Sequence, residues 1–475
     1  MSSPHPLNKS ELLRSVHSAL RAWHSPGGTP ESLLESLLIV RAHRDDIGDY
    51  SSPSMLRLAT SQILLEAIDD LEQHDQKGAR VLRLRFPDDN TLVMVAHKLN
   101  VSEHTVSRLQ RAAIEQLGDI LMAQELAFRE RKAHSMEASL PPPSYSRLIG
   151  LEEAGSLLLK KLLHVGSPWA IAVVGIGGIG KTALADSIVR QALWAFRFDQ
   201  IVWLRADPKT MSGLSHSSQL TYENLIADLA DHLWPGSAEL TPAKRIEQVR
   251  RELKNRPMLV VIDNLESETD ALFLLAHLND LADPSKFLLT SRTRPAPETA
   301  VFSYSLGELS LADATALLNH HAQEIGLEGL AEITASETKE IYAVTGGNPL
   351  ALKLVISLID VMPLAEIFTG MTKSRQGPIE ELYRHIYWKA WQSLSDRAHS
   401  LLLAMPLVAR AGAHPEQLQE VTGLVDAQFW LAVQELRKRS LLEVQGNIRE
   451  RRYGIHRLTE TFLNTEVLQR PNEVG

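Results

Sequence analysis

Apolar positions change their spacing several times along the chain, and each change predicts a different kind of secondary structure. Between residues 10 and 73 they recur at helical spacing, with breaks at residues 26–28 and 51–53. Helical spacing continues over residues 79–131. Three consecutive prolines at positions 141–143 then prevent a helix from continuing, which indicates a linker. The N-terminal part is therefore predicted to be all-helical.

Beyond the linker, short apolar runs of strand length alternate with helical stretches. Strands are expected at residues 171–174, 201–204, 259–262 and 287–289. Strands that alternate with helices are typical of βα units, whose strands form one parallel sheet. After about residue 305 the spacing is helical again, and it ends in a hairpin-like segment near residues 441–454.

Composition narrows the class of protein. A length of 475 residues exceeds what one hydrophobic core usually organises, so several domains are expected. The absence of cysteine excludes disulfides, thiolate zinc sites and cysteine nucleophiles, and it is consistent with a reducing compartment. The sequence has no signal peptide and no apolar run of membrane-spanning length. We therefore expect a cytoplasmic protein with no membrane partner.

A glycine-rich segment directly after the first expected strand carries the clearest chemical signal. Residues 175–182 read Gly-Ile-Gly-Gly-Ile-Gly-Lys-Thr and match the phosphate-binding pattern G-x-x-x-x-G-K-[ST], with a helical pattern behind it. Glycines allow several backbone N–H groups to converge on a phosphate, where a Cβ would obstruct the approach. Lys181 would neutralise the outer phosphates, and the Thr182 hydroxyl would coordinate Mg²⁺. The predicted contacts to ADP or ATP in this loop are Gly175, Gly177, Gly178, Ile179, Gly180, Lys181, Thr182 and Ala183.

A P-loop also needs a carboxylate for the metal ion at the end of a neighbouring buried strand. Asp263 follows the apolar run 258–262 and is the predicted Mg²⁺ partner of Thr182, although an aspartate that begins a turn after a strand has the same local pattern. The next residue is Asn264, so a second carboxylate that could orient water is missing there, and Glu266 is the nearest substitute. We therefore expect slow, regulatory ATP hydrolysis.

Three further segments, in the same order, resemble the NB-ARC branch of the signal-transduction ATPases with numerous domains, the STAND class. Residues 287–292 resemble its strand with a sensor arginine, residues 346–352 (Gly-Gly-Asn-Pro-Leu-Ala-Leu) resemble its G-x-P-L-A motif, and residues 148–153 resemble the segment that contacts adenine in relatives. The resemblance covers about residues 148–467. It implies a P-loop domain, a helical domain and a winged-helix domain that close over ADP and open when ATP replaces it.

The resemblance also assigns roles to individual residues. Arg292 would sense the γ-phosphate, which makes Asp263, Glu266 and Arg292 the expected catalytic side chains. His456 stands where the family's Met-His-Asp histidine approaches the β-phosphate of ADP, and Arg457 replaces the aspartate. Further nucleotide contacts are expected from Ile149, Gly150, Pro349 and Leu350. Alternatively, Arg292 is a solvated surface arginine, Pro349 is a proline that begins a helix, and His456 is a structural histidine.

Residues 79–117 resemble the promoter-reading helix-turn-helix of bacterial sigma factors and related regulators. Its first helix would run over residues 91–99 and its turn over 100–102, with Ser102 as the N-cap of the second helix. The apolar corner between the helices is expected from Ala96, Leu99, Val101 and Val106.

The exposed face of the second helix would enter a major groove of double-stranded DNA. Its predicted DNA contacts are His104, Thr105, Ser107, Arg108 and Arg111. The net charge of the chain is −9, so attraction to DNA must come from a local basic face, and between residues 79 and 112 six basic residues oppose three acidic ones. So few cations give weak, salt-sensitive binding unless several copies assemble. The alternative is a helix-turn-helix used only for packing or protein contacts.

Together these patterns predict a multidomain α/β plus all-α protein, with a P-loop NTPase parallel sheet flanked by a helical domain and a winged-helix domain. The expected domains are an N-terminal helical region (1–78), a helix-turn-helix domain (79–135), a linker (136–147), a P-loop domain (148–300), a helical ARC-like domain (301–377) and a winged-helix domain (378–470).

The mechanism that these features favour is a nucleotide-controlled switch. ADP would hold a compact inactive monomer, and exchange for ATP would open the chain and permit homo-oligomerisation. Three downstream roles remain open: transcriptional regulation through DNA, an immune or antiphage sensor whose N-terminal domain recruits an effector protein, and an ATPase whose turnover is itself the product. Relatives carry sensing repeats after the winged helix, so the signal is expected from such a domain or from a separate sensor protein.

Overall fold

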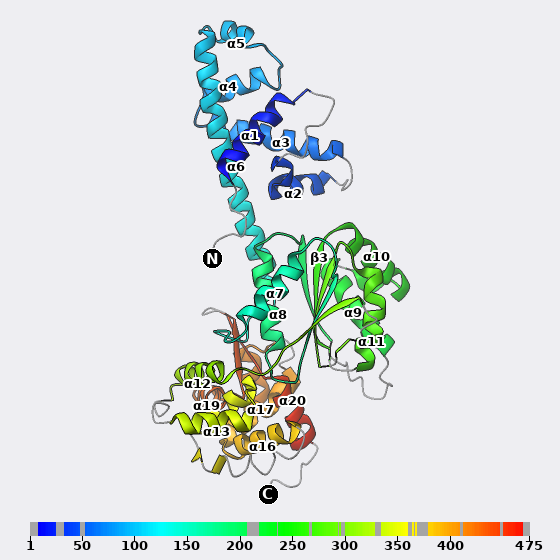
Figure 1. Cartoon of the computed structure of the whole chain (residues 1–475), viewed down its shortest axis with the longest axis vertical. Coiled ribbons are helices and arrows are strands. Elements are labelled where there is room, and N and C mark those ends of the chain that lie inside the picture. The colour runs from blue at the N-terminus through cyan, green and yellow to red at the C-terminus, as the bar shows by residue number, and fades with distance from the viewer. Residues whose placement is uncertain are drawn as a thin grey trace. The chain divides into compact units, whose positions relative to one another are not determined.

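In the computed structural model, the chain forms two compact units, an N-terminal unit, Met1–Ala138, and a C-terminal unit, Ser139–Gly475 (Figure 1). The structure describes residues 8–24, 33–47, 53–206, 218–234, 236–265, 268–292, 294–295, 300–327, 334–359, 363–364, 366–367, 379–408, 412–446 and 450–468. Within these ranges, no helix is both long enough and apolar enough to cross a bilayer.

In its described residues, the N-terminal unit is all-helical, as expected. Its elements are α1 (Lys9–Arg21), η1 (Leu33–Ser36), α2 (Leu38–Ile47), α3 (Pro53–Glu72), α4 (Gln76–Arg85), α5 (Leu92–Leu99) and α6 (Glu103–Ala138). Leucine, valine and alanine side chains of α1 to α4 pack against α6 in one core. Helix α6 also contributes a buried carboxylate, Glu125, which accepts the backbone N–H groups of Leu38 and Ile39, both at 3.1 Å. A negative charge is favourable there because these N–H groups begin α2.

The helix-turn-helix consists of α5, a tight turn and the first part of α6. Asn100 adopts the left-handed conformation with φ 53°, and the Ser102 hydroxyl accepts the Thr105 N–H at 3.2 Å, which confirms Ser102 as the N-cap. Val95, Ala96 and Val106 are buried together with Val81 from α4, and Leu99 packs against them. The expectation that Val101 belongs to this corner was wrong. Its side chain is 37% exposed, because the turn at Asn100 directs the following residue outward.

A parallel five-stranded sheet organises the C-terminal unit. Its strands are β1 (Ala170–Val174), β2 (Gln200–Arg205), β3 (Met258–Leu265), β4 (Lys286–Ser291) and β5 (Val301–Ser305), in the order β2-β3-β4-β1-β5. The first four match the expected strands. β5 was not expected, and it extends the sheet past residue 300, where we had placed the end of the P-loop domain. Its residues are only half-buried, so its apolar signal is weak.

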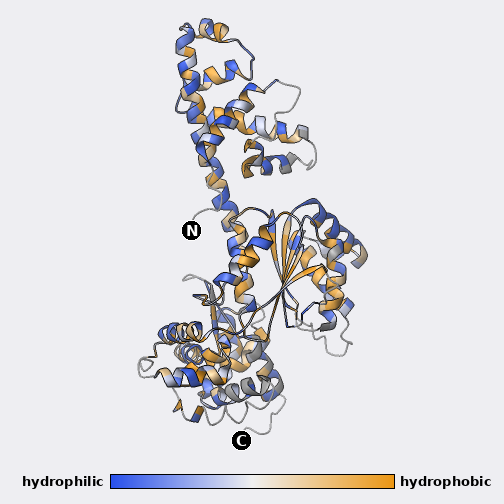
Figure 2. Ribbon diagram, viewed as in Figure 1, coloured by the Kyte–Doolittle hydropathy of each residue, from blue (hydrophilic) through white to orange (hydrophobic). Residues whose placement is uncertain are grey.

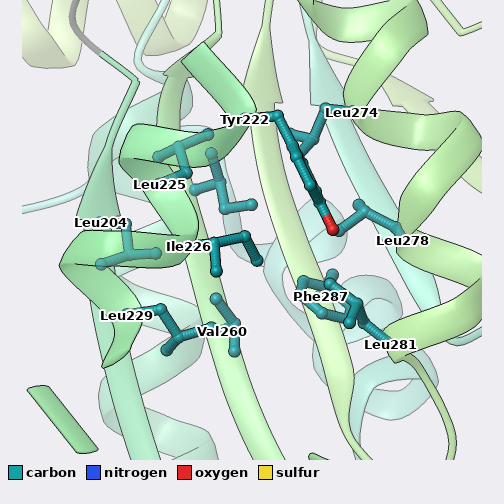
Figure 3. Close-up of a pocket in the computed structure, with 11 residues that line it drawn as sticks. Leu204, Tyr222, Leu225, Ile226, Leu229, Val260, Leu274, Leu278, Leu281 and Phe287 are labelled. Carbon is teal, nitrogen blue, oxygen red and sulfur yellow. The ribbon is translucent and has the colours of Figure 1, made fainter. Parts of the chain in front are cut away.

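Helices cover both faces of this sheet (Figure 1). They are α7 (Glu152–Leu163), α8 (Lys181–Leu193), α9 (Ser218–Leu233), η2 (Ser237–Glu239), α10 (Pro242–Asn255) and α11 (Glu268–Leu281). Alternate residues of the strands face α9, α10 and α11 and form one apolar core, and the strands are correspondingly hydrophobic in Figure 2. A cavity of about 10 Å³ remains within this core, lined by side chains such as Tyr222, Val260 and Phe287 (Figure 3). A space with room for about one water molecule, in an apolar lining, is no nucleotide site.

The remainder of the C-terminal unit is mainly helical. Its elements are α12 (Leu311–Ile325), α13 (Ala335–Thr345), α14 (Pro349–Ile359), α16 (Ile379–Gln392), α17 (Asp396–Val408), α18 (Pro415–Thr422), α19 (Asp426–Lys438), β6 (Glu443–Gly446), β7 (Arg451–Gly454), α20 (Arg457–Phe462) and η4 (Leu463–Val467). We call α12 to α14 the helical segment and α17 to α20 the winged-helix segment. In the latter, β6 and β7 form the expected antiparallel hairpin, and β7 also bridges to Ala413 through Tyr453. Both segments share one apolar core.

Candidate nucleotide site

The P-loop lies between the end of β1 and the start of α8. Gly178 and Gly180 have φ values of +72° and +102°, a conformation that favours glycine. Gly175 is constrained differently, because a Cβ at this position would lie 2.9 Å from the carbonyl oxygen of Leu306. The loop therefore requires glycine for backbone conformation at two positions and for close packing at a third.

The predicted metal-binding side chains meet beside this loop. The Thr182 hydroxyl donates to Asp263 Oδ1 at 2.8 Å, and Asp263 is 2% exposed at the end of β3. Thr290 on β4 donates to the same oxygen at 2.5 Å, and its hydroxyl accepts the Asn264 N–H at 2.8 Å. The sequence analysis missed Thr290, because one threonine within an apolar strand has no distinctive pattern.

This arrangement fits a magnesium-bound nucleotide. Mg²⁺ prefers oxygen ligands, and it is commonly bound by one or two protein groups together with substrate phosphates. Thr182 and Asp263 are such a pair, at the start of α8, where backbone N–H groups and the helix dipole favour an anion. The Lys181 ammonium lies over the same loop, since it donates to the carbonyls of Gly175 and Ile176, both at 2.9 Å.

The helical segment is docked directly on the P-loop. Asn348, which is fully buried, donates from Nδ2 to the Gly177 carbonyl at 3.1 Å, and the Leu350 N–H donates to the Gly178 carbonyl at 3.3 Å. The Oδ1 atom of Asn348 accepts the N–H groups of Leu350 and Ala351 at 3.0 and 3.3 Å, so the same side chain caps α14. Asn348 belongs to the motif that predicted Pro349 and Leu350, but we had not singled it out.

A third part of the chain reaches the site through His456, which directly precedes α20. Burial, together with the positive charges of Lys181, Lys353, Arg292 and Arg205, lowers the pKa of His456 to about 4. Four cations in or directly beside four different elements therefore act on one imidazole. The predicted residues Lys181 and Arg292 act electrostatically on His456, and so do Arg205 and Lys353, which the sequence analysis missed.

The segment expected to contact adenine lies against the helical segment. Gly150 has φ +71°, and a Cβ there would lie 2.9 Å from the Asp313 side chain at the start of α12. Ile149 is partly buried and packs against the core shared by the helical and winged-helix segments. Pro349 and Ala183 are partly buried, whereas Ile179 and Leu350 are buried. Glu266 and the side chain of Arg457 lie outside the described residues.

A polar junction joins the helical and winged-helix segments. His321 Nε2 lies 2.6 Å from the Ser440 hydroxyl, and Ser440 lies 2.6 Å from the Ser357 hydroxyl on α14. His321 is only 8% exposed, and burial lowers its pKa. The three side chains therefore form a satisfied hydrogen-bond chain at the contact of α12, α14 and the end of α19.

The candidate DNA-binding face of α6 is exposed. His104, Ser107, Arg108 and Arg111 are exposed, and Thr105 is half-buried with its hydroxyl 2.9 Å from that of Ser102. Other cations of the region are engaged within the N-terminal unit. Arg83 pairs with Asp69 and Glu72, whereas Arg85 and Lys98 hydrogen-bond to Gln110 and Asn90, respectively. The local basic face is thus smaller than the sequence count suggested.

The fold and the phosphate loop define a P-loop nucleotide-binding protein, and family comparisons make this more specific. Residues 152–315 match the NB-ARC domain, and residues 71–118 match Sigma-70, region 4. The chain therefore contains an NB-ARC-type P-loop domain, preceded by a sigma-like helix-turn-helix. The resemblance drawn from the motifs is confirmed, and an NB-ARC domain with this loop implies nucleotide binding.

Similar proteins include plant proteins much longer than this chain. The disease resistance-like protein DSC1 of Arabidopsis thaliana is 27% identical over 225 residues, which cover 46% of this chain and 17% of the plant protein. The inactive disease susceptibility protein LOV1 of the same plant is 23% identical over 317 residues, which cover 61% of this chain and 32% of the plant protein. A STAND protein with a tetratricopeptide repeat sensor from Pyrococcus horikoshii, of known structure, is 18% identical and covers 70% of this chain and 44% of its own, with a TM-score of 0.43.

Proposed function

We propose that the protein is a nucleotide-controlled switch that is closed with ADP and open with ATP. The observation that carries the proposal is the convergence of three distant segments on the P-loop: the Thr182–Asp263 pair, the N-terminus of α14 and His456. A nucleotide in the loop would contact all three at once. Replacing ADP by ATP would therefore change the contacts that hold the helical and winged-helix segments to the P-loop domain.

Such a switch needs several contacts. Inverting a two-state population from 1:99 to 99:1 requires about 5.5 kcal/mol of differential binding. A hydrogen bond to a charged group contributes about 1.5–3 kcal/mol, so Arg292 alone is insufficient. The groups available are Lys181, Thr182, Asp263, Arg292 and His456. Several of these groups must therefore act together.

The test measures molecular mass and bound nucleotide together, with ADP and with a non-hydrolysable ATP analogue. We expect a monomer with ADP and a larger assembly with the analogue. Lys181→Ala should lose nucleotide and remain monomeric, because the phosphates lose their main counter-charge. A mutant that still copurifies with ADP would refute the site assignment, and identical masses with both nucleotides would refute the switch.

Hydrolysis in this proposal resets the switch slowly. Asp263 would hold Mg²⁺ with Thr182, while the position after Asp263 is Asn264, whose N–H is bonded to Thr290. No second carboxylate follows directly to orient water. Turnover of many ATP molecules per second would contradict this view and favour an ATPase whose turnover is the product.

We propose that the output is DNA binding through α6. Arg108 and Arg111 are exposed on the helix that would enter the groove, and assembly on ATP would multiply weak single contacts. Arg108→Glu with Arg111→Glu should abolish retention on DNA without changing ADP content. The matched control is Arg131→Glu, which reverses an exposed charge on the same helix but far from its start.

A second output, recruitment of an effector protein, is favoured by one observation. Val93 and Met94 on α5 are 59% and 49% exposed, which places apolar side chains on the outer surface of the helix-turn-helix rather than within its core. The similarity to plant disease resistance and susceptibility proteins also supports an immune role. Two results together would support this alternative. DNA retention should survive the α6 double substitution, and the output signal should be lost when Val93→Ser and Met94→Ser are combined.

A further inference from the structure

Two cations that no motif of the chain singles out, Arg205 and Lys353, act on His456 together with the P-loop lysine. We propose that Arg205 and Lys353 complete the phosphate-binding site, Arg205 from the sheet edge and Lys353 from the helical segment. The inference rests on the proposed nucleotide site and extends it from the P-loop to two further elements.

Arg205 is positioned by the sheet. It is the last residue of β2, in register with Asp263 at the end of β3, and the N–H of the next residue, Ala206, donates to the Asp263 carbonyl at 2.9 Å. Adjacent strands lie about 4.8 Å apart, so Arg205 begins beside the carboxylate that holds the predicted metal ion. Its side chain is exposed at the edge where ligands bind to parallel α/β sheets.

Lys353 is positioned by α14. The N-terminus of this helix is fixed on the P-loop by the contacts of Asn348 and Leu350. Lys353 lies about one turn further along, roughly 6 Å in rise from Pro349, and the two side chains share one face. Side chains of a helix incline toward its N-terminus, so the long lysine stem extends back toward the loop. The neighbours Leu352 and Leu354 are buried, whereas Lys353 is only partly buried.

The charges of these two residues converge with those already assigned. The four cations that act on His456 are Lys181, Lys353, Arg292 and Arg205. Both new residues therefore act on the same histidine as the P-loop lysine. Like charges gathered in one place repel each other, and an anion that they share lowers this repulsion. A nucleotide polyphosphate is such an anion. Lys353 would then give the helical segment a direct charge contact with the ligand, in addition to its backbone docking on the loop.

The test replaces each charged side chain by a shorter, uncharged polar one. Arg205→Gln and Lys353→Gln are each expected to weaken Mg²⁺–ADP binding about tenfold at low salt, the effect of one lost charge-assisted hydrogen bond. The difference in ADP affinity between each variant and the unsubstituted protein should become smaller at high salt, because salt screens charge contacts and leaves packing unchanged. Arg205→Lys and Lys353→Arg should retain most of the affinity. The controls are Arg251→Gln on α10 and Lys339→Gln on α13, both exposed, which should bind normally.

Titration calorimetry at two salt concentrations separates the outcomes. Affinities within about twofold of the unsubstituted protein, or losses that are the same at both salt concentrations, would overturn the inference. If Lys181→Ala loses ADP while the two glutamine variants bind it normally, the proposed function stands and this inference fails. If the unsubstituted chain binds neither nucleotide, both fail.

Discussion

The contact between α14 and the P-loop allows one prediction to be worked out in detail, because a single side chain, Asn348, serves two purposes. Its Oδ1 atom caps α14, and its Nδ2 atom donates to the Gly177 carbonyl at 3.1 Å. Replacing an N-cap residue by alanine costs about 1 kcal/mol. Losing the bond to the partly buried Gly177 carbonyl costs about 1–2 kcal/mol more. We therefore expect Asn348→Ala to lower the free energy of unfolding by about 2–3 kcal/mol.

A second substitution separates these two contributions. Serine caps helices about as well as asparagine, but it is too short to reach the Gly177 carbonyl. Asn348→Ser should therefore keep the cap and lose only the contact with the P-loop, at a cost of about 1–2 kcal/mol. The control is Thr334→Ala, which removes an exposed cap on α13 that has no contact with the loop.

Urea unfolding and ADP titration measure the two effects independently. Asn348→Ser should weaken ADP binding, because the helical segment no longer holds the loop in place, whereas Thr334→Ala should reduce stability and leave affinity unchanged. If Asn348→Ser matches the unsubstituted protein in both stability and affinity, then the bond to Gly177 contributes nothing, and the docking of α14 on the loop rests on the backbone contact of Leu350 alone.

Two further predictions concern protonation and backbone conformation. The pKa of His456 is lowered to about 4, and a bound phosphate should raise it. ADP binding should therefore take up protons at about pH 5.5, and it should become tighter as the pH falls through the raised pKa of His456. The proton uptake is measured as a binding heat that depends on the ionisation enthalpy of the buffer. The same uptake in His456→Gln would contradict this. Gly347 and Gly346 both have positive φ, but only at Gly347 would a Cβ meet backbone, 2.6 Å from the Leu309 carbonyl. Gly347→Ala should therefore lower the melting temperature clearly more than Gly346→Ala, and equal effects would show that this close approach is tolerated.

The part of the site that could be predicted is the part that is local in sequence. The P-loop places glycines, Lys181 and Thr182 on neighbouring residues, and Asp263 ends a buried strand, so each carries its own signal. Arg205 and Lys353 carry none: an arginine after a strand and a lysine in an apolar helix are ordinary, and only the tertiary structure brings their charges to His456. In the fold, β5 was missed because its half-buried residues lack a strong apolar run.

The junction of His321, Ser357 and Ser440 has a consequence for reversibility. Exposing hydrocarbon to water costs about 25 cal/mol per Å², which makes apolar contacts slow to part. Hydroxyl and imidazole groups lose little on exposure, because water replaces the partners that they give up. At this point α12 and α14 meet the winged-helix segment through groups that bond equally well to each other and to solvent. Parting at this point alone would therefore expose little hydrocarbon, whereas full separation of the two segments would expose the apolar core that they share.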